Sequence, residues 1–189
     1  MKKTFFAFAL SSLLAGQAFA APQSYVIDSS HTFPRFSYGH LGMSKQILRF
    51  DQTEGKVVLD KDAKQAQVDV VINMKSVSTG FALFNEHIQG EDFFHTAQFP
   101  TATFTSTKVA FEGDRPVSIE GDLTIKGITK TVTLTVTSFW SGDHPMMQKP
   151  AIGANAVGVI KRSEFNAGQF APAIGDEVTL DIALEALAE

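Results

Sequence analysis

Apolar and polar residues alternate with a period of two along most of the chain, as in strands with one buried face. The clearest run spans 129–137, where threonine occupies every odd position and Val132, Leu134 and Val136 lie between. A similar run spans 117–125, and Lys126-Gly127 separates the two. Because glycine adopts the positive φ that a tight turn requires, these runs predict an antiparallel hairpin.

The same alternation recurs in three further segments, and two longer segments of strand-like composition complete the set. The five segments are 31–41, 45–60, 67–74, 101–105 and 178–185. Roughly eight strands with no helices between most of them predict an all-β fold. Long strands joined by short hairpins favour an eight-stranded antiparallel barrel over a sandwich.

One stretch has the period of a helix instead. Phe81, Phe84 and Ile88 recur at i, i+3 and i+7, which places them on one side of a helix. Gly90 is placed to end this helix, and Pro100 precedes the next strand. We therefore expect a short helical insertion that packs over an opening of the barrel or against its wall.

The first twenty residues have the pattern of a secretory signal. Lys2 and Lys3 form a basic start, 5–15 is apolar apart from two serines, and Ala18-Phe19-Ala20 is a small-x-small cleavage site. The apolar run is too short to span a bilayer. We expect residues 1–20 to be removed, which leaves one exported domain at 21–189.

Composition narrows the classes of function. The 189 residues suffice for one domain with a core, and the formal charge of −4 argues against nucleic acid as the main partner. The absence of cysteine excludes disulfides, thiolate metal sites and a thiol nucleophile. No P-loop, dinucleotide, zinc-protease or nucleophile-elbow motif occurs, so no catalytic residues and no cofactor are assigned.

Phenylalanine is unusually frequent, with 17 residues against two tyrosines and one tryptophan. A small closed barrel can fill its interior with side chains or hold one ligand, and the phenylalanines fit either use. The five histidines form no close HxH or HxxxH pair, so we expect surface or hydrogen-bonded roles and no metal site. Basic residues near strand ends are either solvated or aimed at an anionic head group.

Four blocks in order resemble the YceI family of exported bacterial proteins, described as binding polyisoprenoids or other lipids. The blocks are Tyr25-Val26-Ile27-Asp28 with His40-Leu41-Gly42; Asp92-Phe93-Phe94 with Phe99-Pro100-Thr101-Ala102-Thr103-Phe104; Gly121-Asp122-Leu123-Thr124-Ile125-Lys126-Gly127; and Arg162-Ser163-Glu164-Phe165. The blocks are spread from 25 to 165, and the resemblance runs over nearly all of 21–189. The resemblance implies a lipocalin-like eight-stranded antiparallel barrel with a short helical insertion and an elongated pocket for one long-chain lipid.

Strand parity and the resemblance together give a candidate ligand site. Phe36, Tyr38 and His40 are expected on the inner face of the first long strand, since Phe36 and His40 match inward positions of the family. Further lining candidates are Phe50, Phe104, Phe139, Trp140 and Phe165, and candidates for closing one end are Phe84, Ile88, Phe93 and Phe94. His40, with Arg49 or Arg162, is expected to face a polar head group.

The leading hypothesis is a non-catalytic carrier or store of a long-chain isoprenoid, a quinone or another lipid in the periplasm, with a homodimer as one option for its assembly. The alternative is a hydrolase or isomerase acting on a hydrophobic substrate in the same tunnel. A third is an empty barrel that serves only as a scaffold for partners. Integral insertion into a membrane is not expected, because the faces opposite the aliphatic ones carry Thr, Ser, Asp and Glu.

Overall fold

The computed structural model describes residues 21–189, and these form an all-β chain. The predicted signal segment, 1–20, lies outside the described residues. The elements are β1 (Gln23–Ile27), β2 (Phe33–His40), β3 (Ser44–Phe50), β4 (Thr53–Asp60), β5 (Gln65–Asn73), η1 (Met74–Ser76), β6 (Val77–Ser78), α1 (Ala82–His87), β7 (Thr101–Glu112), β8 (Arg115–Ile125), β9 (Ile128–Asp143), β10 (Pro150–Lys161), η2 (Arg162–Phe165) and β11 (Ile174–Ala188).

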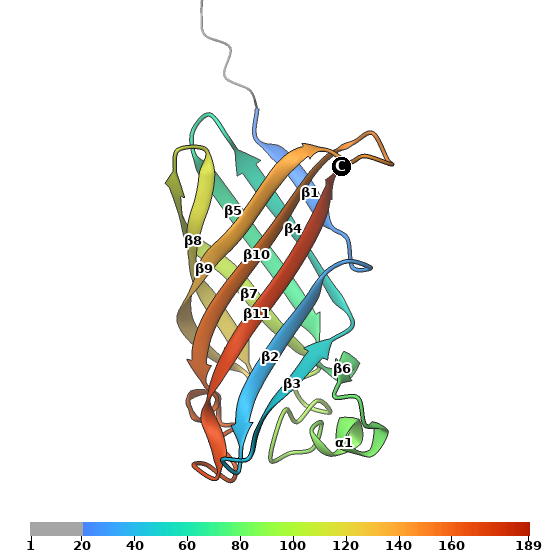
Figure 1. Cartoon of the computed structure of the whole chain (residues 1–189), viewed down its shortest axis with the longest axis vertical. Helices are drawn as coiled ribbons and strands as arrows, with labels where there is room; N and C mark the ends of the chain where they lie inside the picture. Colours follow the sequence, from blue (N-terminus) through green and yellow to red (C-terminus); the bar gives the residue numbers. More distant parts are fainter. Residues whose placement is uncertain (1–20) are drawn as a thin grey trace, which may run out of the picture.

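The strands form one antiparallel sheet that closes into an elongated barrel (Figure 1). The closed ring runs β1-β4-β5-β7-β8-β9-β10-β11, and pairing of β1 with β11 completes it. Strand β2 follows β1 and also pairs with β11, while β3 precedes β4 and pairs with β2. The predicted eight-stranded antiparallel barrel is therefore confirmed, with its first two strands each broken into two pieces.

The predicted hairpin joins β8 to β9. Lys126 (φ 50°) and Gly127 (φ 74°) both have positive φ, and Ile125 pairs with Ile128, as in a two-residue hairpin turn. The threonines of β9 lie on the outer face, where the Thr131 hydroxyl donates to Asp122 Oδ1 at 2.9 Å. The aliphatic face turns inward, which is the arrangement that the alternation predicts.

The helical insertion is also present. Helix α1 (Ala82–His87) ends before Gly90, and Pro100 comes directly before β7, as expected. In Figure 1 the insertion lies at the lower end of the barrel, beside β3 and β6. Within residues 21–189 no helix is both long enough and apolar enough to cross a membrane.

The segment 45–60 is two strands rather than one. At the break, the backbone N–H of Asp51 and that of Gln52 donate to the carbonyl and hydroxyl oxygens of Ser76, while Gln52 accepts from Asn73 N–H. The chain therefore satisfies these backbone groups against η1 instead of against a neighbouring strand. Pro34, which lacks an N–H, lies one residue before the pairing of β2 with β3 begins at Arg35.

The two ends of the barrel are filled differently. Strand β1, the second half of β4 and the end of β11 lie at the upper end in Figure 1. These segments carry buried side chains, among them Tyr25, Ile27, Val57, Leu59 and Ala186. The lower end is covered by three loops: the 41–43 turn, the 79–100 insertion and the 162–173 loop. The cavity inside the barrel extends toward the lower end, because Ile88 of the insertion and Phe165 of the 162–173 loop are among its lining residues.

Candidate ligand-binding site

The interior of the barrel holds one elongated apolar cavity. Its volume is about 220 Å³, counted as the space that the centre of a water molecule can reach. That space is many times the roughly 10–15 Å³ that a single water molecule needs. Lining residues on β11 run from Ile174 to Leu184, a path of roughly 30 Å at about 3.3 Å per residue.

Inward-facing aliphatic side chains form most of the wall. They come from β5, β7, β8, β9, β10 and β11, for example Val70 of β5, Leu123 of β8, Val132 of β9 and Ala156 of β10. Alternation along each strand turns these side chains inward and leaves Thr, Asp and Lys outside. A ligand in this space would meet hydrocarbon on nearly every side.

Three phenylalanines form a packed aromatic group in the wall. The rings of Phe36 and Phe50 stack with centroids 5.4 Å apart, and Phe94 meets Phe36 edge-on at 5.9 Å and Phe50 at 5.7 Å. The group joins β2 and β3 to the helical insertion. Because each ring is held by two others, this part of the wall is rigid before any ligand enters.

Arg162 holds the lower loop in place. Its guanidinium donates to four backbone carbonyls at 2.7–2.8 Å: those of Gly175, Ala167, Gln169 and Ile174. Burial lowers the pKa of Arg162, although the group remains a cation at neutral pH. Four of its five N–H donors are thus used within the protein, so Arg162 is mainly a loop organiser.

Tyr38 brings a hydroxyl to the cavity wall. Burial raises the pKa of the Tyr38 hydroxyl, against the effect of the nearby Arg162 charge, so the group is a neutral donor and acceptor at neutral pH. Among the hydrogen bonds of residues 21–189, none involves this hydroxyl. It is therefore available to a polar atom of a ligand.

Lys126 joins two of the lower loops. Its ammonium donates to the carbonyl of Glu91 in the insertion at 3.0 Å and to that of Asn166 in the 162–173 loop at 2.7 Å. Burial lowers the pKa of Lys126. The tight hairpin turn at Lys126 therefore ties the insertion to the loop on the other side of the lower end.

Ten of the fourteen residues predicted from the sequence lie in the cavity wall. They are Phe36, Tyr38, Phe50, Phe84, Ile88, Phe93, Phe94, Phe104, Arg162 and Phe165. Phe84, Ile88, Phe93 and Phe94 all come from the insertion, as the sequence predicts for residues that close one end. Contact of these residues with a ligand remains a prediction.

Four predicted residues lie elsewhere, and the placement is corrected for each. Arg49 points outward between buried Leu48 and Phe50, pairs with Asp51 at 2.7 Å and lies over the Phe33 ring. His40 lies at the last residue of β2, beyond the wall of the cavity. The alternation along β2 predicted that His40 would face inward, but β2 ends at this residue.

Phe139 and Trp140 are consecutive, so only one of them can face inward. A β-bulge at Thr137 of β9, opposite Asn155 and Ala156 of β10, adds one residue to β9 and so reverses which of the following residues face inward. Phe139 then packs against the core, outside the cavity wall, while Trp140 is half exposed on the outer face. Sequence alternation alone does not reveal the bulge.

The sequence prediction missed most of the aliphatic lining because it ranked aromatic residues first. Alternation at 67–74 and 178–185 contained the signal for Val68, Val70, Val178 and Leu180, all of which line the cavity. Strand β10 was not predicted as a strand. Its contributions, among them Ala154 and Ala156, could not be found without it.

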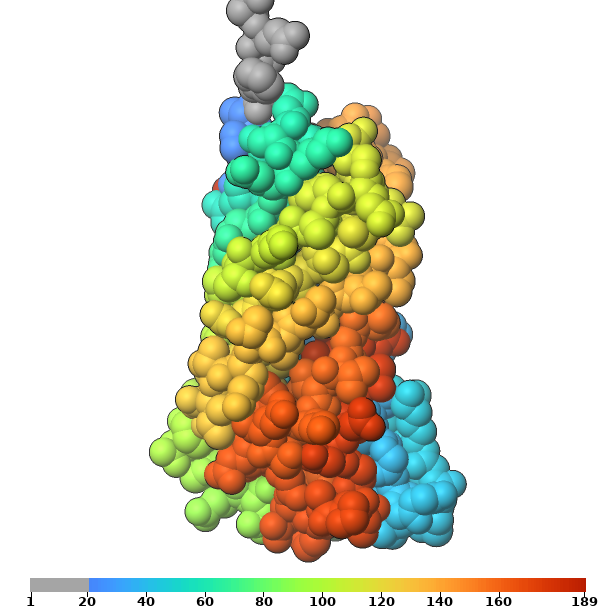
Figure 2. Space-filling view, turned by 90° about the vertical axis from the view of Figure 1, so that its left-hand side faces the viewer, coloured from blue at the N-terminus to red at the C-terminus, as the bar shows by residue number. Residues whose placement is uncertain are grey.

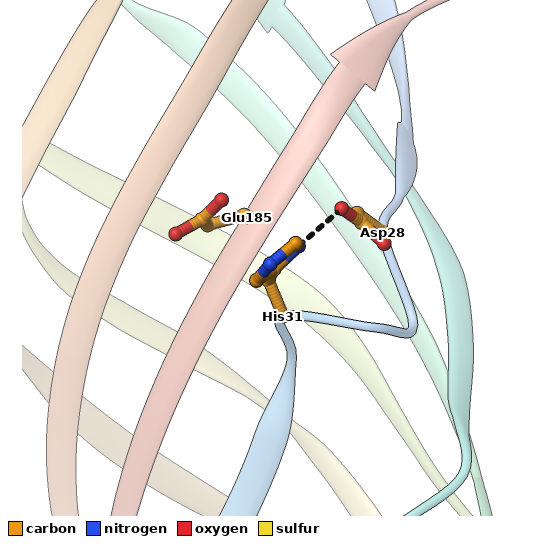
Figure 3. A group of neighbouring side chains, drawn as sticks. All are labelled: Asp28, His31 and Glu185. Carbon is orange, nitrogen blue, oxygen red and sulfur yellow. Dashed lines mark hydrogen bonds and ion pairs between the residues drawn. The ribbon is translucent and has the colours of Figure 1, made fainter.

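A polar cluster lies outside the barrel, where the β1–β2 turn meets β11 (Figure 3). His31 Nδ1 lies 2.7 Å from Asp28 Oδ2, and Ser30 donates to Asp28 through its backbone N–H and hydroxyl. Glu185 of β11 lies beside them, with ligand atoms of all three residues within 4.8 Å of one another. The hydrogen bonds of Asp28 with Ser30 and His31 stabilise the conformation of the turn.

The Asp28–His31 pair predicts that the stability of the fold depends on pH. The hydrogen bond to Asp28 raises the pKa of His31, and hydrogen bonds from His31 and Ser30 lower the pKa of Asp28 to about 2. His31 therefore stabilises the fold below its unfolded pKa, and this contribution is lost as pH rises through its raised folded pKa. Asp28 contributes above its unfolded pKa, and this contribution is lost as pH falls through about 2.

We expect NMR titration to show His31 releasing its proton above its usual pH, and Asp28→Asn to move that titration down. Ser29, in the same turn, gives a matched control through Ser29→Ala. A His31 titration unmoved by Asp28→Asn would contradict the assignment.

Fold and cavity together define a closed antiparallel β-barrel protein with an internal apolar chamber. A sequence model described as "YceI-like domain" matches residues 25–186. Protein YceI of Salmonella arizonae is 39% identical over 188 residues, covering 98% of this chain and 97% of that protein. The chain belongs to the YceI-like family, as the sequence blocks indicate.

Solved structures show the same barrel. The crystal structure of Burkholderia cenocepacia BcnA matches with a TM-score of 0.71 and 25% identity, covering 84% of this chain and 98% of that chain. A polyisoprenoid-binding domain from Saccharophagus degradans, implicated in plant cell wall breakdown, matches with a TM-score of 0.67 and 19% identity, covering 88% and 99%. At that identity the second likeness shows the fold alone.

Proposed function

We propose that the protein binds one long-chain isoprenoid, a quinone or a related lipid inside the barrel and carries or stores it in the periplasm without catalysis. The observation that carries this proposal is the elongated cavity with its hydrocarbon wall. The name of the Saccharophagus degradans domain, which is polyisoprenoid-binding, agrees with it. The signal pattern at 1–20 supports the proposed periplasmic location.

The shape of the cavity favours a chain-like ligand. Burial of about 500 Å² of tail would contribute on the order of 12 kcal/mol. Lost translational and rotational freedom removes an estimated 4–15 kcal/mol of that. Net affinity therefore depends on a wall that needs no rearrangement, and the Phe36–Phe50–Phe94 group provides one.

The polar groups in the wall favour a head group that accepts a hydrogen bond. Tyr38 offers a free hydroxyl, and Arg162 keeps one N–H beyond the four that hold the loop. A carbonyl or ether oxygen would match the Tyr38 hydroxyl.

The proposal of a non-catalytic role rests on the chemistry of the wall. The lining residues within 21–189 include no Ser, His, Asp or Glu, which a hydrolase or isomerase would use as nucleophile or base. His40, which the sequence offered as a catalytic candidate, lies beyond the wall, and Tyr38 is the lining residue that a catalytic alternative would have to use.

Native mass spectrometry of protein purified from its host without detergent tests the proposal. We expect a species heavier than the polypeptide by one lipid, which extraction identifies as an isoprenoid or related chain. The same spectrum gives the oligomeric state, for which a homodimer remains an expectation. A spectrum that shows no species other than the empty protein would contradict the binding proposal. Chemical conversion of the extracted lipid by the protein, if it were lost in His40→Ala, would contradict the non-catalytic role.

A further inference from the structure

Large apolar side chains are exposed on the loops at the lower end of the barrel. Phe81 and Leu83 of the insertion, Leu41 and Met43 of the β2–β3 turn, and Phe170 of the 162–173 loop are each more than half exposed. Figure 2 shows these segments together at the lower end: the green insertion, the orange-red loop and the blue turn. Five such side chains on three neighbouring loops form what we call the apolar rim.

The apolar rim is continuous with the cavity. Phe93 lines the cavity wall, and its ring lies 6.3 Å from that of exposed Phe170. Phe84 and Ile88 also line the cavity, while Phe81 and Leu83 of the same insertion face solvent. Apolar side chains therefore extend from the cavity to the surface at the lower end of the barrel, where the buried side chains of Ile88 and Phe165 lie between the two.

The charges around the apolar rim balance. The lower segments 40–45, 74–100, 126–130 and 161–177 contain six basic residues, Lys45, Lys75, Lys126, Lys130, Lys161 and Arg162, and six acidic residues, Glu86, Glu91, Asp92, Glu164, Asp176 and Glu177. A surface of this kind has no net attraction for anionic lipid or for a strongly charged protein. Its association would be driven by apolar burial.

We propose that the apolar rim docks on the surface of a lipid bilayer, so that a lipid passes between membrane and cavity without crossing water. This inference rests on the proposed function, since the ligand is then itself a membrane lipid. Each rim side chain would enter the boundary between head groups and acyl chains. Lys126 and the Phe93–Phe170 contact join the two loops that the lipid would pass between.

Flotation with vesicles of zwitterionic phosphatidylcholine tests the docking. The protein should float with the vesicles, and raising salt from about 50 to about 500 mM should leave the bound fraction nearly unchanged, because screening weakens only charge attraction. The triple variant Phe81→Ser, Leu83→Gln, Phe170→Asn should partition at least about tenfold less, since binding scales with buried apolar area. Serine suits the helix N-cap at 81, and asparagine suits the positive φ at 170.

Met146 and Met147 provide the matched control. Both are exposed in the β9–β10 turn at the opposite end of the barrel, so Met146→Ser, Met147→Ser removes similar apolar surface away from the apolar rim. This variant should float like the unaltered protein, and thermal unfolding should show that both variants are folded. Absent flotation of the unaltered protein, release by salt, or equal loss in both variants would each overturn the docking proposal.

A parallel measurement separates this inference from the proposed function. Each variant is mixed with detergent-solubilised isoprenoid and examined by native mass spectrometry. Binding from detergent together with absent flotation would overturn bilayer docking alone and leave the rim as a contact for a delivering protein. Absent binding from detergent in the unaltered protein would overturn the proposed function as well.

Discussion

The Ala156→Phe variant should fold normally and purify with at least about tenfold less bound lipid, a change of about 1.4 kcal/mol or more in binding free energy. Ala156 is buried in β10 and lines the middle of the cavity, where it pairs with Val136 on one side and Ile182 on the other. A phenylalanine ring there would occupy space that the ligand needs. Overpacking a filled core lowers the free energy of unfolding by ~1–3 kcal/mol. Because the space beside Ala156 is empty in the barrel, the added ring should not cause this loss.

Val157→Phe is the control for this variant. Val157 is the next residue of β10, points outward and is partly exposed, so the same ring added there leaves the cavity unchanged. Bound lipid is measured by extraction and mass spectrometry, and stability by thermal unfolding. Full lipid occupancy in Ala156→Phe would show that the ligand lies elsewhere.

Arg162→Met should lower the free energy of unfolding by about 3–5 kcal/mol. Methionine retains the apolar stem but leaves four backbone carbonyls of the 162–176 segment without their donor, three in part-buried hydrogen bonds and that of Gln169 in an exposed one. An unsatisfied group costs about 1–3 kcal/mol when it is fully buried. Partial access of water to these carbonyls keeps the total below the sum. Urea unfolding measures the loss as a lower midpoint.

Lys161→Met and Arg162→Lys make the test specific. Lys161 is the exposed neighbour of Arg162, and its substitution should change stability by less than about 0.5 kcal/mol. Lysine at 162 keeps the charge but loses the planar set of donors, so most of the loss should remain. If Arg162→Lys were fully stable, charge rather than the four directed hydrogen bonds would hold the loop.

The parts of the fold that the sequence predicted are those in which local signals agree. The 117–137 hairpin has alternating strands and a turn with glycine where positive φ is needed, and the structure places each accordingly. Helix α1 ends before Gly90 as predicted, but Phe81 of the predicted apolar side is its exposed N-cap and Ile88 follows its last residue. In these segments, signals from neighbouring residues suffice to locate the elements.

Strand β10 shows why local signals can fail. Gly153 and Gly158 lie within this continuous strand, and glycine and alanine both have a low propensity for strands. The sequence of β10 alone therefore gives little indication of a strand. The strand forms because β9 and β11 pair with it on both sides. Such pairing brings together residues far apart in the chain, and periodicity does not reveal it.

The sequence predicted part of the candidate site and missed the rest, as it did for the fold. Parity on β2 placed Phe36 and Tyr38 at the wall, but the bulge opposite Asn155 and Ala156 decided which of Phe139 and Trp140 faces inward. Arg162 was expected to face a head group, whereas most of its donors hold the lower loop. The sequence does not show which groups an arginine will bond, because its partners depend on the conformation of the folded loop.

Contacts between bound isoprenoid and side chains inside the barrel test the central claim most directly. Intermolecular nuclear Overhauser effects between the methyl groups of the lipid and those of Leu123 and Val132 should be observed, because both side chains line the cavity. The Trp140 indole, on the outer face, should show none. Lipid contacts confined to the outer surface, with none to Leu123 or Val132, would contradict an interior binding site.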